Sequence, residues 1–153
     1  MTLLPDALRF LSVFCAGIAA GTWVVTQLAL IPAQRELGEA SAITLLRVTE
    51  KGIVRYNPLC ATASTVAGLL LLTLRIPPAG RAALLTTIGC LAALASTLIS
   101  MLWNMPLRKR IAGGPPGSIP AGYPESQRRW NRGNLARMVL GLVAFAGYLL
   151  ATL

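Results

Sequence analysis

The chain has 153 residues, of which 55% are hydrophobic and only 12% are charged. A soluble domain carries about 25% charged residues, so the missing surface charge argues against a water-soluble monomer. The hydrophobic share also excludes a disordered chain, which needs low hydrophobicity. The length predicts a single domain over residues 1–153, and 14 Lys and Arg against 5 Asp and Glu give a net charge of +9.

The sequence contains no histidine. This removes the commonest general base, the commonest metal ligand and any haem held by histidine. The cysteines Cys15, Cys60 and Cys90 are scattered and form no Cys-x-x-Cys pair, so we expect no metal site. Helix rise places Cys15 and Cys90 at similar depths and Cys60 near the other end. A disulfide between the first two stays open, although we favour buried free thiols.

Four uncharged apolar runs follow one another, at residues 10–34, 57–74, 82–107 and 138–153. Crossing a bilayer as a helix takes about 20 apolar residues, and the last run reaches this length only by including the turn before it. The runs are too long and too rich in Ala and Leu for strands. We therefore predict an all-α integral membrane protein, an antiparallel four-helix bundle with spans at about 8–31, 57–75, 82–105 and 134–153.

The connections between these spans differ in character. Within residues 32–56, apolar residues at Leu37, Ala40, Leu45, Val48 and Ile53 follow an imperfect helical spacing. They predict an amphipathic helix that lies on the membrane surface between the first two spans. The second long connection, residues 106–133, is rich in Gly and Pro at 113–124 and is expected to be irregular.

Basic residues orient the predicted bundle. The two long connections, together with Arg137, hold eleven of the 14 Lys and Arg residues, whereas Arg9, Arg75 and Arg81 lie on the other side. By the positive-inside rule, the long connections are cytoplasmic and both termini face outward from the cell membrane. Orientation and anionic lipid headgroups then explain the basic surplus, and no motif supports nucleic-acid binding.

Polar residues gather at the cytoplasmic ends of the four predicted helices, whereas the outer halves are mostly Leu, Ala and Thr. Amides inside hydrocarbon must find partners, and ionisable groups there are functional candidates. Trp130, Asn134 and Arg137 have the spacing i, i+4, i+7, which places them on one helix face. We therefore predict a pocket open to the inner leaflet. The other candidates for it are Trp23, Gln27, Tyr56, Asn57, Trp103 and Asn104.

A plainer interpretation of these residues stays open. Arg137 lies near a helix end, so its guanidinium could extend to the lipid headgroups. Trp130, Trp103 and Tyr56 could form an aromatic belt at the membrane interface. All five acidic residues lie outside the predicted spans, which disfavours an ion transporter because such proteins usually place an acid in the membrane.

Three stretches of the chain resemble motifs of the anthrone oxygenase family of small four-helix membrane proteins. Residues 21–33 (GTWVVTQLALIPA) are similar to the family's first helix and the Val-x-Pro-Ala-Leu-like segment that ends it. Residues 103–107 (WNMPL) are similar to an Asn-x-Pro-Leu-Asn element at the end of the third helix. Residues 128–137 (RRWNRGNLAR) carry a Trp-x-x-x-Asn-x-x-Arg element that opens the fourth. The chain departs from the family at Arg108, where members often have Asn, and at Leu135, where they often have His.

The resemblance implies an oxygenase that acts on a polycyclic aromatic such as an anthrone, without metal or flavin. An anthrone ionises to an enolate that reacts directly with O₂, so the protein need only remove a proton and hold the oxyanion. The base would be a carboxylate at the pocket mouth, water, or no group beyond an Arg-stabilised enolate. The catalytic donors would be Arg137, Asn134, Asn104 and Trp130, and the substrate-binding residues Trp103, Trp23, Gln27, Asn57 and Tyr56.

Other functions remain open at this point. The same acid–base groups could serve a cyclase or an isomerase in a biosynthetic pathway. A different class is a membrane module without catalysis, which binds a small molecule or is a subunit of a membrane complex. Gly17 and Gly21 form a Gly-x-x-x-Gly motif, which permits close helix contact within the bundle or between copies in a homo-oligomer. The expected partners are a lipophilic small molecule and membrane lipids.

Overall fold

The computed structural model describes residues 3–76, 79–115 and 117–153, with the backbone alone at residues 50, 51 and 53–55. All regular secondary structure in these ranges is helical, which confirms the expected all-α class. The elements in chain order are α1 (Leu3–Val25), a π-helical turn (Thr26–Leu30), α2 (Ile31–Glu36), α3 (Glu39–Thr73), α4 (Arg81–Ile99), a second π-helical turn (Ser100–Asn104), α5 (Met105–Ala112) and α6 (Tyr123–Leu150).

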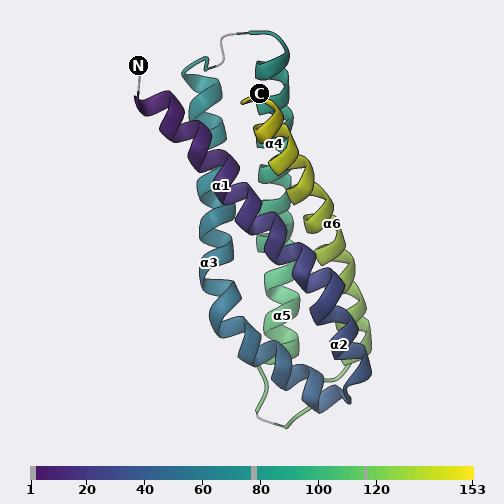
Figure 1. Ribbon diagram of the computed structural model, residues 1–153. Coiled ribbons are helices and arrows are strands. Elements are labelled where there is room, and N and C mark those ends of the chain that lie inside the picture. Colours follow the sequence, from purple (N-terminus) through teal and green to yellow (C-terminus); the bar gives the residue numbers. More distant parts are fainter. Residues whose placement is uncertain (1–2, 77–78, 116) are drawn as a thin grey trace.

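The long helices α1, α3, α4 and α6 lie side by side and give the molecule an elongated shape (Figure 1). Helix α1 packs on α3 and α6, and α4 packs on the same two helices. Each long helix therefore contacts two neighbours around a common axis. The two ends of the chain lie at the same end of the molecule, and α2 and α5 lie toward the opposite end (Figure 1).

Three helical stretches are long and apolar enough to cross a membrane, Leu3–Glu36, Arg81–Ala112 and Tyr123–Leu150. They contain the predicted spans 8–31 and 82–105 and most of the span 134–153, which agrees with the expectation of a membrane protein. The predicted span 57–75 lies largely in α3, which is not among these stretches. The count of four helices is not confirmed, because the described residues divide into more helical segments than that.

The prediction of a surface helix between the first two spans is wrong. Residues 39–73 form the single helix α3, which passes through Pro58 without a break. At its beginning the buried residues are Ala42, Ile43 and Leu46, whereas Leu37 and Val48 of the predicted apolar face are 43% and 65% exposed. The segment is therefore held by packing on neighbouring helices through a different face from the predicted one. The cluster that covers it consists of Ile31, Ile43, Leu46, Ile111, Tyr123 and Trp130.

The second long connection is also more helical than expected. Helix α5 ends at Ala112 and α6 begins at Tyr123. Within this connection, irregular backbone is therefore confined, among the described residues, to 113–115 and 117–122. Pro124 lies in the first turn of α6. Proline is tolerated there because the N–H groups of the first turn have no hydrogen-bond acceptor within the helix. Arg47 of α3 holds the segment, because its Nε donates to the carbonyl of Ala112 at 2.9 Å and its Nη2 to that of Gly114 at 2.7 Å.

Each π-helical turn stands just before a proline. Pro32 and Pro106 follow the turns Thr26–Leu30 and Ser100–Asn104 at the second position. A proline inside an α-helix removes one hydrogen bond and its ring clashes with the carbonyl four residues earlier. The wider turn relieves this clash by an i→i+5 bond, from the N–H of Met105 to the carbonyl of Ser100 in the second case. The helices therefore continue past both prolines.

The cysteines Cys15, Cys60 and Cys90 are free. Cys60 packs against the cluster of Ala19, Trp23 and Ala61, whereas Cys90 belongs to a different cluster, with Ala16 and Tyr148. Of the two glycines in the Gly-x-x-x-Gly motif, Gly17 faces the ring of Phe145, whereas a Cβ added at Gly21 would meet nothing within 4 Å.

Candidate functional site

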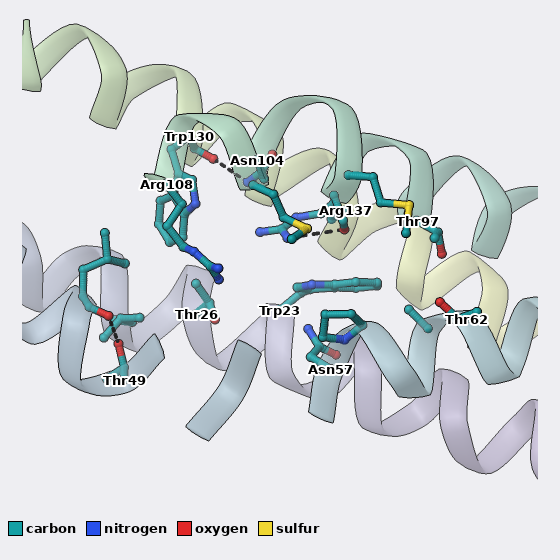
Figure 2. A pocket seen from close by; sticks show the side chains of 17 residues that line it. Trp23, Thr26, Thr49, Asn57, Thr62, Thr97, Asn104, Arg108, Trp130 and Arg137 are labelled. Atoms are coloured by element: carbon teal, nitrogen blue, oxygen red, sulfur yellow. Dashed lines mark hydrogen bonds between the residues drawn. The ribbon is translucent and has the colours of Figure 1, made fainter. Parts of the chain in front are cut away.

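A cavity of about 100 Å³ lies among the long helices, where the two π-helical turns, α5 and the middle of α6 meet (Figure 2). Its walls combine apolar side chains with a few polar ones from every long helix. The lining residues are Trp23, Thr26, Leu30, Leu46, Thr49, Asn57, Pro58, Ala61, Thr62, Thr97, Ser100, Met101, Asn104, Met105, Arg108, Trp130 and Arg137.

The guanidinium of Arg137 is held from three sides. Its Nη2 donates to Oδ1 of Asn134 at 2.9 Å, and its Nη1 donates to Oγ of Ser100 at 3.4 Å. Its Cζ lies 5.7 Å from the centre of the Trp23 ring, a cation–π distance. Arg137 is thus directed into the bundle, so the extension of this side chain to the lipid headgroups is not observed.

Asn134 stands behind Arg137 and has no solvent exposure. Its Nδ2 donates to Oε1 of Gln27 at 3.1 Å and, less closely, to the carbonyl of Trp23 at 3.4 Å. Both acceptors belong to the first helical stretch, whereas Asn134 belongs to α6. The amide therefore connects the two stretches and presents its oxygen to Arg137.

Asn104 closes the cavity on the side of α5. It is buried, and its Nδ2 donates to the carbonyl of Trp130 at 3.2 Å. Glycine at position 133 makes this contact possible, because a Cβ there would collide with Oδ1 of Asn104. The indole of Trp130, 5% exposed, lines the cavity and also belongs to the apolar cluster around Leu46.

The family model described as anthrone oxygenase matches residues 45–147, more than half of the chain. The chain belongs to the anthrone oxygenase family. No curated protein and no solved structure matches it. In this anthrone oxygenase family member the matched region begins in α3 and ends in α6, so it contains Asn57, Asn104, Trp130 and Arg137 but not Trp23.

Five of the candidates named from the sequence line the cavity, namely Trp23, Asn57, Asn104, Trp130 and Arg137. Gln27 and Asn134 stand outside its lining and connect to it through Arg137. Trp103 and Tyr56 are 53% and 64% exposed and do not line it.

Some of the aromatic residues line the pocket, and others have the exposure expected of an aromatic belt at the membrane interface. Trp23 and Trp130 are nearly inaccessible, 4% and 5% exposed, so they are not part of an interfacial belt. Trp103 faces outward, and its Nε1 donates to the carbonyl of Arg129 on the neighbouring helix at 3.3 Å. Tyr56 is also on the surface. In this family member, therefore, only Trp103 and Tyr56 of these four residues are exposed enough to belong to an aromatic belt at the membrane interface.

Several lining residues were not singled out from the sequence. Arg108 extends from α5 into the cavity (Figure 2), and together with Ser100 and Asn104 it continues one stripe at i, i+4, i+8. The same spacing would have predicted Arg108 as a lining residue if the sequence had shown that the helix continues past Pro106. Leu46 and Thr49 had no such signal, because they belong to the segment expected on the membrane surface.

The cavity offers cationic and apolar surface to a ligand. Arg108 and Arg137 line it, and no carboxylate does so in the part of the chain that the structure describes. Within the same ranges, no three Cys, Asp or Glu side chains lie close enough together to hold a metal ion. Two guanidinium groups among apolar walls suit a flat, lipophilic molecule that carries or develops negative charge on oxygen.

Proposed function

We propose that this protein oxygenates a lipophilic, enolisable aromatic with O₂, an anthrone being the type substrate, and that it needs neither metal nor flavin. The observation that carries the proposal is the guanidinium of Arg137, held by Asn134 beside Trp23 in the wall of an apolar cavity. A cation fixed in such a site stabilises an oxyanion more than water does, because nothing must reorganise when the charge develops. Membership of the anthrone oxygenase family supports the same chemistry.

The proposed reaction begins when the methylene group of the anthrone loses a proton and the negative charge moves to the carbonyl oxygen, which Arg137 binds. The enolate carbon then transfers electrons to O₂ and forms a C–O bond. The peroxide takes up a proton, and loss of water from the hydroperoxide turns the carbon into a ketone. One O₂ thus converts one CH₂ group into C=O and one molecule of water.

Water is the proton acceptor in this proposal. The chain has no histidine, and no described carboxylate lines the cavity. A weak base is sufficient if the bound cation lowers the pKa of the substrate's methylene group, since Arg137 stabilises the enolate and not the neutral ketone. The indoles of Trp130 and Trp23 supply flat walls for the aromatic rings, and Met101 and Met105 can adapt to the substrate's outline.

We also propose that the second half of α3 is a fourth membrane crossing and that the ends near α2 and α5 face the cytoplasm. The segments at these ends are rich in basic residues, as the positive-inside rule requires of cytoplasmic segments. They include Arg35, Arg47, Arg108, Lys109 and Arg110. Reporter fusions test this. A periplasmically active phosphatase should be active when fused after residue 153 and inactive when fused after Gly114, and the reverse result would reject the orientation.

The test of the activity uses the purified protein in detergent with anthrone and dissolved O₂. We expect O₂ uptake and formation of anthraquinone in equal amounts, and a loss of about 10²–10³-fold in kcat in the Arg137→Leu variant. Arg132→Leu, an exposed arginine on the same helix, is the matched control and should keep full activity. Conversion without O₂ uptake would point to a cyclase or isomerase, and binding without conversion to a non-catalytic module. Full activity in Arg137→Leu would reject the proposed role of this cation.

A further inference from the structure

We infer that Gln27 is a positioning residue, which acts through Asn134 to fix the guanidinium of Arg137 at the cavity wall. The inference rests on the proposed function for its kinetic consequences, but its geometric part stands independently. Gln27 and Asn134 do not line the cavity. A direct contact with substrate is therefore not the role that the structure supports for either amide.

The direction of the Asn134 side chain is set by its partners. An amide has a donor end and an acceptor end, and the Nδ2 end of Asn134 faces two acceptors, Oε1 of Gln27 and the carbonyl of Trp23. If the amide were flipped, oxygen would face oxygen on that side, and its NH₂ group would face the donor Nη2 of Arg137. Only the observed direction satisfies all three contacts, so the oxygen points at Arg137.

Gln27 makes the closer of the two contacts on the donor side, 3.1 Å against 3.4 Å for the carbonyl of Trp23. Asn134 is wholly buried, so water cannot replace a lost acceptor, and a buried donor without a partner is costly. Loss of the Gln27 oxygen therefore weakens the constraint that keeps the Asn134 oxygen on Arg137. The guanidinium would then be less well fixed, because its remaining hydrogen bond, to Ser100, is long at 3.4 Å.

A spectroscopic experiment tests the geometric part without any turnover. The chain has three tryptophans, so Trp103→Phe with Trp130→Phe leaves Trp23 as the single emitter, with Arg137 against its ring. In this background we expect Gln27→Leu to shift the Trp23 emission in the same direction as Arg137→Leu. Gln127→Leu is the matched control, because Gln127 donates to Gln34 at 2.7 Å in a separate amide cluster, and it should leave the emission unchanged. An emission spectrum that Gln27→Leu does not alter would overturn the inference.

A kinetic double-mutant cycle tests the relay itself. We expect Gln27→Leu to lower kcat about tenfold, the range of one hydrogen bond, with KM unchanged because Gln27 does not line the cavity. Gln27→Glu keeps the acceptor oxygen and should restore most of kcat. In an Asn134→Ala background Gln27→Leu should have no further effect, since residues that act through one contact are not additive. Additive effects would overturn the relay. If the wild-type protein turns over no substrate while the emission shift is seen, the proposed function fails and the positioning contact stands.

Discussion

Gly133 of α6 lies directly against the side chain of Asn104, so closely that the Cα hydrogen is all that fits between the two. Asn104 in turn donates to the carbonyl of Trp130. The spacing between α6 and the second π-helical turn therefore depends on the missing side chain at position 133. This contact joins two of the sequence motifs at one point of the cavity wall.

Gly133→Ala should destabilise the protein by about 1–3 kcal/mol, the usual cost of overpacking a tight interior, because the buried Asn104 side chain must leave its hydrogen bond. Thermal unfolding in detergent, followed by tryptophan fluorescence, measures the loss. Gly21→Ala is the control, since a Cβ there would meet nothing within 4 Å, and it should be neutral or stabilising by up to about 1 kcal/mol through helix propensity. Equal stability of the two variants would contradict the packing described for Gly133.

The two tryptophans beside Asn104 should differ in their effect on ligand binding. Trp130→Phe is expected to weaken the binding of an aromatic ligand such as anthraquinone, because the indole forms part of the cavity wall. Trp103→Phe should leave the affinity unchanged, because Trp103 is 53% exposed and stands outside the lining. Calorimetric titration of both variants decides this. A weaker affinity in Trp103→Phe would instead support the substrate contact expected from the sequence.

The pH dependence of turnover should follow the substrate and not a protein group. If water takes the proton, kcat rises with pH as the bound anthrone ionises, and then reaches a plateau. The midpoint should move to lower pH with anthrones that are more acidic in free solution. A midpoint that stays constant through such a series would indicate a base supplied by the protein.

Arg47 should control the order of the connection between α5 and α6. Its guanidinium donates to the carbonyls of Ala112, Gly114 and Pro115, an arrangement that a lysine ammonium cannot reproduce because it lacks the planar fork. Arg47→Lys is therefore expected to increase the rate of proteolysis at residues 113–122 while the membrane helices stay intact. Arg110→Lys, an exposed arginine on α5, is the control. Unchanged protection in Arg47→Lys would show that these hydrogen bonds do not order the segment.

The sequence by itself determined the class of this protein and where its polar chemistry gathers. Long uncharged runs can be buried only as helices in lipid, since every backbone group must be bonded within the segment. The motif Trp130, Asn134 and Arg137 needed only the period of a helix to be placed on one face, and its resemblance to the anthrone oxygenases agrees with the family match over residues 45–147.

Only the tertiary structure decided how far each helix runs and which side chains meet. Residues 39–56 continue α3 because Ile43 and Leu46 find apolar partners on α2, α5 and α6, and no local pattern contains those partners. The same holds within the motifs. Asn104 is buried and Trp103, one position earlier, is exposed, because only one face of that turn is covered by α6. Gln27, expected at the substrate, stands behind Asn134, since contacts between helices distant in sequence follow from packing and not from spacing along the chain.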